Sequence, residues 1–362
     1  IVIDGNGSID NEPVLESVAA RSRFVGLGVT GAIGGSERAV GIRLDTGSDG
    51  AAVAAATVWG NGSDGIMVRG ASSVRISGSV VLANGSSSHR NADGIWARDT
   101  NGLEIQDSVI AGNTGMGIDL RNGNSGFVIQ RNLIEGNGAP VAGGSGNNRS
   151  GVAVRRSPDG VIAKKIITGN TDEGVLVYNN TSSYGVRITQ NSIYGNGQQG
   201  IDLGGSQAGG NGVTLNDNND TDNGPNTLFN YPVLETAKIS GAMLTLSGFA
   251  RPGTQIELFV SDLDVGGFGE GQTYLTTLVE GDATDTDGGT GSYVGPVNGV
   301  DQGSDNSNRF RFEIPLSTLP GVTAGVELTA TGTDSSGDTS EFSGRVTTQG
   351  GTDVSGVVWL DS

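Results

Sequence analysis

The sequence predicts an all-β protein in which a first half of stacked coils is followed by an antiparallel sandwich. Three observations support this fold class. Glycine accounts for 64 of the 362 residues without the Gly-X-Y period of collagen, a short motif recurs along the first half, and alternating apolar runs follow in the second. There is no cysteine and only one histidine, which excludes disulfides, thiolate chemistry and metal sites built from several histidines.

A glycine followed by an apolar–x–apolar step restarts a unit seven times in the first half. These glycines are Gly41, Gly65, Gly94, Gly117, Gly151, Gly174 and Gly200. An asparagine precedes each restart from the second onward, at Asn61, Asn84, Asn113, Asn137, Asn170 and Asn196. Two spacings of 29 and 34 residues fall to 23 and 24 when six residues after Asn84 and ten after Asn137 are treated as insertions. The first half is therefore a repeat of about 23 residues.

Each unit contains three short apolar runs separated by Gly, Asn, Asp and Ser corners. Such strands are too short to form a core alone, but stacked coils pair each strand with its equivalents above and below at about 4.8 Å. The period-two alternation predicts two inward columns. The first column is Ile42, Ile66, Ile95, Ile118, Val152, Val175 and Ile201. The second column is Leu44, Val68, Ala97, Leu120, Val154, Val177 and Leu203.

This coil pattern resembles the right-handed parallel β-helix repeat family, whose units read N-x-I-x-G-N-x-x-x-G-I-x-L. The stretch NSIYGN at residues 191–196, followed by GIDL at residues 200–203, matches it directly. The resemblance covers residues 1–212 and implies a right-handed parallel β-helix of seven or eight coils. It implies no single activity, because the family holds polysaccharide lyases, hydrolases, adhesins and structural modules.

The coil motif stops after Gly212, and three further segments follow. Residues 213–232 read as an acidic hinge or linker, and residues 233–348 carry the alternating runs of an antiparallel β-sandwich. Residues 349–362 form a terminal strand, either the start of a further repeat or a strand shared between subunits.

Specific stretches of the second half carry another resemblance. GPNTL at 224–228, YPVL at 231–234 and FGEGQTYL at 268–275, with residues 328–343, resemble the immunoglobulin-like module that follows β-helices in large secreted or cell-surface bacterial proteins. Residues 354–362 resemble the first strand of the B-type repeats in serine-aspartate surface adhesins. Both resemblances imply an extracellular or cell-surface location and no catalytic signature.

Charge separates the two halves and excludes some partners. Residues 1–210 carry 16 basic and 18 acidic side chains, whereas residues 211–362 carry 5 and 21. A domain this acidic repels nucleic acid and anionic membrane surfaces. No apolar run reaches the roughly 18 residues of a membrane span, so we expect no membrane insertion.

Two acidic groups are candidate calcium sites, because carboxylate oxygens suit this hard cation. The first group is Asp282, Asp285 and Asp287, in a glycine-rich stretch, and the second is Asp217, Asp220 and Asp222, in the linker. The alternative interpretation is that both are solvated acidic loops.

A stripe of arginines is the candidate ligand surface. Arg69, Arg98, Arg121 and Arg155 occupy the same outward position of successive coils. Like charges stacked about 5 Å apart need acidic partners or an anionic ligand, and a polyuronate laid along the coils would be such a ligand. The alternative is that Asp99, Asp119 and solvent screen the arginines.

No catalytic constellation stands out, and the sequence predicts that the chain is not an enzyme. Asp119 and Asp202 share an outward column, but three coil steps place them about 14 Å apart, too far for a glycosidase pair.

Strands at both ends of the chain predict end-to-end self-association of an extracellular structural or adhesive module. The assembly residues are Ile1, Val2, Ile3, Val354, Val357, Val358 and Trp359. One alternative is a protein that binds or degrades an acidic polysaccharide, with a glycan as its partner. Another is a fragment of a giant surface adhesin, whose neighbouring domains would be the partners.

Overall fold

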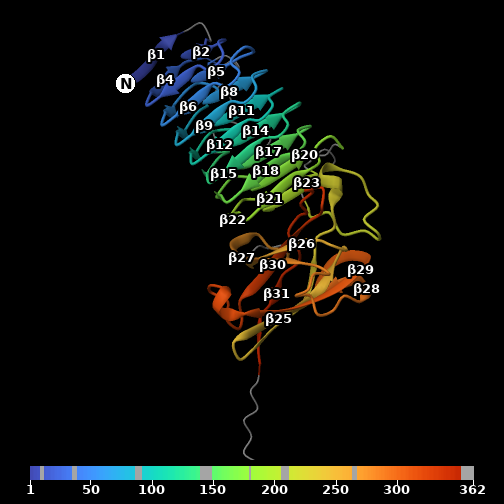
Figure 1. The fold of residues 1–362 in the computed structure, drawn as a ribbon. Helices are drawn as coiled ribbons and strands as arrows, with labels where there is room; N and C mark the ends of the chain where they lie inside the picture. The colour runs from blue at the N-terminus through green and yellow to red at the C-terminus, as the bar shows by residue number, and fades with distance from the viewer. Residues whose placement is uncertain are drawn as a thin grey trace, which may run out of the picture.

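The computed structural model describes residues 1–8, 12–34, 39–85, 92–138, 149–178, 181–204, 212–262 and 267–351, and these are almost entirely β-structure (Figure 1). The helical elements are two short 3-10 turns, η1 (Pro225–Leu228) and η2 (Leu316–Thr318). Among the described residues no helix has the length and apolar character needed to cross a bilayer.

Three parallel sheets form the first half, and each coil contributes one strand to each sheet. Sheet A contains, in spatial order, β1 (Val2–Ser8), β4 (Gly28–Ala32), β7 (Thr57–Trp59), β10 (Val80–Leu82), β13 (Val109–Ala111), β16 (Leu133–Glu135), β19 (Ile166–Thr168) and β22 (Ser192–Tyr194). Sheet B contains β2 (Leu15–Ser17), β5 (Ile42–Leu44), β8 (Ile66–Arg69), β11 (Ile95–Arg98), β14 (Ile118–Arg121), β17 (Val152–Arg155), β20 (Val175–Tyr178) and β23 (Ile201–Gly204). Sheet C contains β3 (Arg23–Val25), β6 (Ala52–Ala54), β9 (Arg75–Ser77), β12 (Glu104–Gln106), β15 (Val128–Gln130), β18 (Gly160–Ala163) and β21 (Val186–Thr189). The predicted parallel β-helix is confirmed.

The predicted inward columns form the core of this β-helix. Ile95 pairs in register with Ile66 and Ile118, and all three are fully buried. Both columns are buried along their whole length. The glycine that opens each coil permits a close approach of backbones: a Cβ on Gly94 would lie 2.7 Å from the carbonyl oxygen of Gly117.

The recurring asparagines stack as a buried ladder along one corner. Asn84 donates both its main-chain N–H (3.1 Å) and its side-chain Nδ2 (3.0 Å) to Oδ1 of Asn113, which donates in the same way to Asn137. The Nδ2 atom of Asn113 also donates to the carbonyl oxygen of Val81 at 3.3 Å. The repeat of asparagine in the sequence is therefore a repeat of one hydrogen-bond pattern.

The second half packs two further sheets face to face. Sheet D has the order β28 (Thr290–Val297), β29 (Val300–Pro315), β25 (Met243–Ala250), β24 (Val233–Ser240) and β32 (Gln349–Gly350). Sheet E has the order β27 (Gly271–Val279), β26 (Gln255–Ser261), β30 (Glu327–Thr333) and β31 (Val346–Thr347). Their pairing is antiparallel except between β24 and β32. The core between them includes Leu246 and Phe312 from sheet D and Leu258 and Leu328 from sheet E.

The sandwich lies against the C-terminal end of the β-helix (Figure 1). Phe259 and Phe342 of the sandwich belong to the same buried cluster as the β-helix core. A Cβ on Gly200, in the last coil, would lie 2.8 Å from the Phe342 ring. The last coil is therefore covered, whereas β1, β2 and β3 end their sheets at the other end.

Candidate functional site

The outer face of sheet B gathers the charged side chains predicted to form a ligand surface. Residues alternate along each strand, so the third and fifth positions of each coil point away from the core. In β11 and β14 these positions hold Trp96 with Arg98 and Asp119 with Arg121, paired in register. The same face carries Arg155 on β17 and Tyr178 on β20.

Asp119 is the centre of this face. Its carboxylate is fully buried and forms ion pairs with Nε of Arg121 at 2.5 Å and Nε of Arg155 at 3.4 Å. The Arg155 guanidinium in turn lies over the Tyr178 ring, 3.7 Å from its centroid. Two cations on one buried carboxylate compensate its charge, and the arginines keep 39% and 21% of their side chains exposed to solvent.

A second carboxyl group, Asp93, lies beside this ion-pair cluster. Asp93 is buried, accepts the N–H of Met116 at 2.8 Å, and donates its own N–H to Asp64 at 2.8 Å. Burial raises the pKa of Asp93 well above its ordinary value, and the charges of Asp119 and Asp64 raise it further. The cluster thus places a buried carboxyl group of raised pKa next to a carboxylate paired with arginines, and two carboxyl groups in different surroundings are the kind of pair that can act as acid and base.

The arginine stripe is ion-paired along its length. Arg69 lies 3.1 Å from Asp45, and Arg98 lies 3.2 Å from Asp99. With Asp119 between Arg121 and Arg155, every predicted arginine has an acidic neighbour. Arg69 and Arg98 remain about half exposed, so their other N–H groups face solvent.

The partner that the structure brings to Asp119 is not the one considered from the sequence. Asp202 lies on β23, three strand steps from β14, whereas Asp93 belongs to the adjacent coil. Asp93 occupies the position just before the coil glycine, which sequence reasoning passed over. This position holds Asp64, Asp93, Met116, Ser150, Glu173 and Gln199 in successive coils. Five of these six residues are polar, and polar residues recurring directly before the coil glycine were the available signal.

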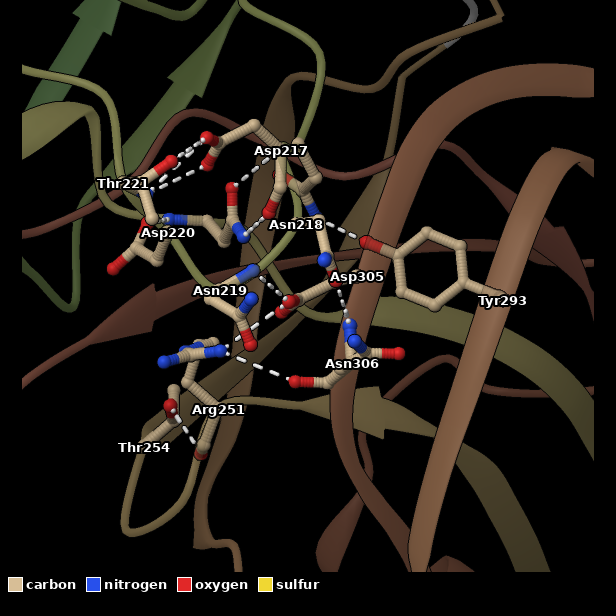
Figure 2. A network of polar contacts seen from close by, with 12 residues as sticks. Asp217, Asn218, Asn219, Asp220, Thr221, Arg251, Thr254, Tyr293, Asp305 and Asn306 are labelled. Carbon is tan, nitrogen blue, oxygen red and sulfur yellow. Dashed lines mark hydrogen bonds and ion pairs between the residues drawn. The ribbon is translucent and has the colours of Figure 1, made fainter.

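The linker brings one of the two predicted metal groups together (Figure 2). One carboxylate oxygen each of Asp217, Asp220 and Asp222 lies within 4.8 Å of the others, so this acidic triad could hold a metal ion. Thr221 donates its N–H and its hydroxyl to Asp217, and Asn230 donates its N–H to Asp220 at 2.9 Å. Burial, followed by repulsion among the carboxylates, raises the pKa of Asp222 to about 6, and burial raises that of Asp220 to about 6.

The carboxylates of the other predicted group bind main-chain and arginine donors. Asp282 accepts the N–H and the hydroxyl of Thr284 at 2.6 Å, which lowers its pKa. Asp285 accepts the N–H of Arg311 at 2.9 Å, and Asp287 lies 3.3 Å from Arg309. Within the described ranges, the linker triad is the group whose oxygens converge closely enough for an ion.

The predicted assembly residues fall into two groups. Ile1 and Val2 are 92% and 63% exposed at the N-terminal end, and Ile3 is half-buried. Val354, Val357, Val358 and Trp359 lie outside the described residues.

Comparison with known proteins identifies one protein family and several solved structures of similar fold. A family model described as a right-handed beta helix region matches residues 29–132 and 84–233. Among solved structures, the mannuronan C-5 epimerase A-module of Azotobacter vinelandii is 20% identical, with a TM-score of 0.45 over 57% of this chain and 56% of that one. A periplasmic alginate epimerase is 15% identical, with a TM-score of 0.41 over 52% of this chain and 40% of that one. Tailspike protein 2 of an Escherichia coli O157:H7 bacteriophage is 12% identical, with a TM-score of 0.39 over 89% of this chain and 56% of that one.

The prediction that the chain is not an enzyme is wrong by this comparison, because two of these three structures are epimerases. This chain spans about half the length of the three structures, and the similarity is low. They therefore name no reaction for this chain, whose chemistry has to be argued from its own residues.

Proposed function

The chain belongs to the right-handed β-helix family, and from this premise we propose that it acts on an acidic polysaccharide bound along the outer face of sheet B. The single observation that supports this function best is the cluster around Asp119. There, two partly exposed arginines and an aromatic ring lie around a buried carboxylate, and the carboxyl group of Asp93, whose pKa burial raises, lies beside them.

The arginines supply recognition. Arg98, Arg121 and Arg155 lie on three consecutive strands of one parallel sheet, so their guanidinium groups repeat along the β-helix axis. A polysaccharide with a carboxylate on each sugar presents charges at a similar repeat, and guanidinium groups bind carboxylates in bidentate fashion. Trp96, half-buried in the adjacent outward column, offers a flat surface for a sugar ring.

The carboxyl pair supplies chemistry. Of this pair, Asp93 is the proposed donor of a proton to the bound sugar and Asp119 the proposed acceptor of a proton from it, while Arg121 and Arg155 hold the Asp119 carboxylate in position. Asp119 lies on β14 and Asp93 directly precedes the coil that contains β11, where hydrogen bonds to Met116 and Asp64 hold it in place.

Binding to polyuronates tests the proposed site. We expect alginate or polygalacturonate to bind the intact chain, and a double variant with Arg98→Gln and Arg121→Gln to bind at least roughly tenfold more weakly. The matched control is Arg131→Gln, an arginine of similar exposure that pairs with Asp107 at 2.7 Å in another part of the coil. A double variant that binds both polymers as tightly as the control contradicts the proposal.

Turnover tests the carboxyl pair separately. Asp119→Asn keeps the size of the side chain but removes its negative charge and its ability to accept a proton. We expect this variant to retain polymer binding within a few-fold and to lose product formation by a factor of about 100 or more, measured by NMR of the incubated polymer. Unchanged turnover in this variant would remove Asp119 from the chemistry.

We also propose that the acidic triad of the linker binds calcium and that the protein works outside the cytoplasm. The triad offers oxygen ligands alone, which this cation prefers. Calcium must displace the protons that Asp220 and Asp222 retain near pH 6, so its effect is larger at pH 7.5 than at pH 5. We expect millimolar calcium to raise the unfolding temperature by about 3 °C at pH 7.5, with no shift in Asp220→Asn and a full shift in Asp282→Asn.

Self-association through Ile1, Val2 and Ile3 stays a prediction. The last coil offers no free edge for such an assembly, because the sandwich covers it.

A further inference from the structure

An open pocket lies on the sandwich, where residues of the linker meet the end of β25 and the strands β28 and β29. Its volume is about 580 Å³, and its walls include Asn219, Arg251, Ser292, Asn306 and Asn308. Every one of these side chains carries a hydrogen-bonding group, and the lining contains no acidic side chain although the second half of the chain has a large acidic excess. The volume is within the range of small-molecule sites.

Arg251 is held in place by its surroundings. Its Nη1 atom donates to Oδ1 of Asp305 and to the main-chain oxygen of Asn306, both at 3.2 Å, and Thr254 closes the turn onto the Arg251 carbonyl. Figure 2 shows the guanidinium below Asn219, with Asp305 on one side of it. Among the described residues the Nη2 and Nε atoms have no acceptor, so two donors of a fixed guanidinium stay available.

The amide side chains around Arg251 are positioned through their main chains. Asp305, which is buried, accepts the N–H of Asn219 at 2.9 Å, and Asn218 accepts the N–H of Asn306 at 3.0 Å. These contacts leave the amides of Asn219 and Asn306 to face solvent, since both residues are exposed. A site whose donors are held before a ligand arrives loses little entropy on binding.

We propose that this pocket binds a sugar acid, with the ligand carboxylate on Arg251 and its hydroxyls on the surrounding amides and Ser292. A carboxylate matches the two free donors of the guanidinium, while hydroxyl groups both donate to and accept from amides. The pocket is a second carbohydrate site on a separate domain, and it does not depend on the function proposed for sheet B.

Calorimetry on the full chain tests the inference with sodium D-glucuronate and D-glucose as probes. We expect glucuronate to bind at least roughly tenfold more tightly than glucose, and Arg251→Gln to abolish that difference. Arg311→Gln is the matched control, because Arg311 is an exposed arginine of the same domain that pairs with Glu313 and does not line the pocket.

Asn306→Asp provides a variant that keeps Arg251 and its bond to Asp305. The contacts of Asn306 described above are made by its main chain, so the fold is retained while a carboxylate enters the pocket. We expect this variant to lose glucuronate binding and to keep that of glucose. Equal binding of the two probes, or unchanged glucuronate binding in both pocket variants, would overturn the inference.

The double variant at Arg98 and Arg121 separates the two sites. It should bind glucuronate like the unaltered chain even where it no longer binds alginate. Loss of glucuronate binding in that variant would assign the ligand to sheet B and overturn the pocket, whatever the outcome for the polymer.

Discussion

The body of the β-helix and its C-terminal end use different acceptors for the hydrogen bonds that run from one coil to the next. In the body, neutral amides do so: Asn113 accepts two hydrogen bonds from Asn84 and passes the pattern to Asn137. At the last coil the pattern ends on a titratable group, because Asn196 donates its Nδ2 to Glu270 of the sandwich at 3.0 Å. Glu270 takes the place of the next asparagine.

Three further main-chain donors of the last coil also end on carboxyl groups of the sandwich. Asp338 accepts the N–H of Gly185 at 2.6 Å, Glu257 that of Gln190 at 2.8 Å, and Glu341 that of Leu203 at 2.8 Å. Burial raises the pKa of Glu341 and of Glu270 to about 8. The body is therefore insensitive to pH where its ladder is neutral, whereas the end depends on the protonation of buried acids.

The largest expected effect comes from removing the apolar centre of the cap. Phe342 is 3% exposed and packs edge-on against Phe259 with ring centroids 5.5 Å apart. We expect Phe342→Ala to lower the free energy of unfolding by about 3–5 kcal/mol, as for other buried phenylalanines. Urea unfolding followed by circular dichroism measures this change. Val294→Ala is the control: Val294 is 85% exposed, and its truncation should change the value by less than about 0.5 kcal/mol.

Breaking the ladder in the body should cost less but still be large. Asn113→Ala removes the acceptor of the Asn84 N–H and the donor to the Val81 carbonyl in a fully buried corner. Unpaired buried groups of this kind cost about 2–3 kcal/mol in the free energy of unfolding. The loss should be the same at pH 6 and pH 8.5, because no titrating group is involved. A loss that varies with pH would contradict the contrast between body and end.

Stability should fall with rising pH because of the cap. Glu341 has an ordinary pKa of 4.5 and a folded-state pKa of about 8, so between these values the folded chain holds a proton that the unfolded chain has released. Its contribution is complete below about pH 4.5 and is lost as the pH rises through 8; Glu270 acts in the same direction. We expect the urea midpoint to decrease between pH 6 and pH 8.5.

Glu341→Gln sharpens this prediction. Glu341 accepts the N–H groups of Leu203 and Thr214 on its two oxygens, and a glutamine can accept only one of them well. The variant should be less stable than the parent at pH 5 and should lose part of the decline toward pH 8.5. Parallel pH curves for the parent and the variant would exclude Glu341 as the titrating group.

Sequence predicted the body well because its structure repeats. The inward columns and the asparagine corner recur at one spacing, so each coil supports the interpretation of the next. Glu270 and Glu341 belong to no repeat, and their meeting with the last coil depends on contacts across 74 and 138 residues of chain. The hairpin of β28 and β29 has little strand signal in the sequence, because much of it lies in a stretch rich in Gly, Asp and Asn. Asp93 was missed because its partner Asp119 is adjacent only through stacking of coils.

The smallest expected effect concerns an exception within the body. A second buried column consists of Ser79, Ser108, Asn132, Lys165 and Asn191. In this column a main-chain N–H donates to the side chain of the next coil: Ser108 N–H to Asn132 Oδ1 at 3.0 Å, and Lys165 N–H to Asn191 Oδ1 at 3.2 Å. The side chain of Lys165 carries no hydrogen-bond acceptor, so it cannot accept the N–H of Asn132 in the preceding coil. Its Nζ atom has no hydrogen-bond partner among the described residues. Burial lowers its pKa well below the ordinary 10.5.

Lys165→Asn should therefore stabilise the chain by about 1 kcal/mol at pH 7, because the asparagine restores the neutral column. The sign of the pH dependence is opposite to that of the cap. Because the folded-state pKa of Lys165 is lowered, the unfolded chain binds the lysine proton more tightly than the folded chain does, so the cost of Lys165 shrinks as the pH rises toward 10.5. The gain from the substitution should be smaller at pH 9 than at pH 7 when both are measured by urea unfolding. A variant that is less stable than the parent at both pH values would mean that the body tolerates a buried amine as readily as its end tolerates buried acids, and the contrast between the two regions would not hold.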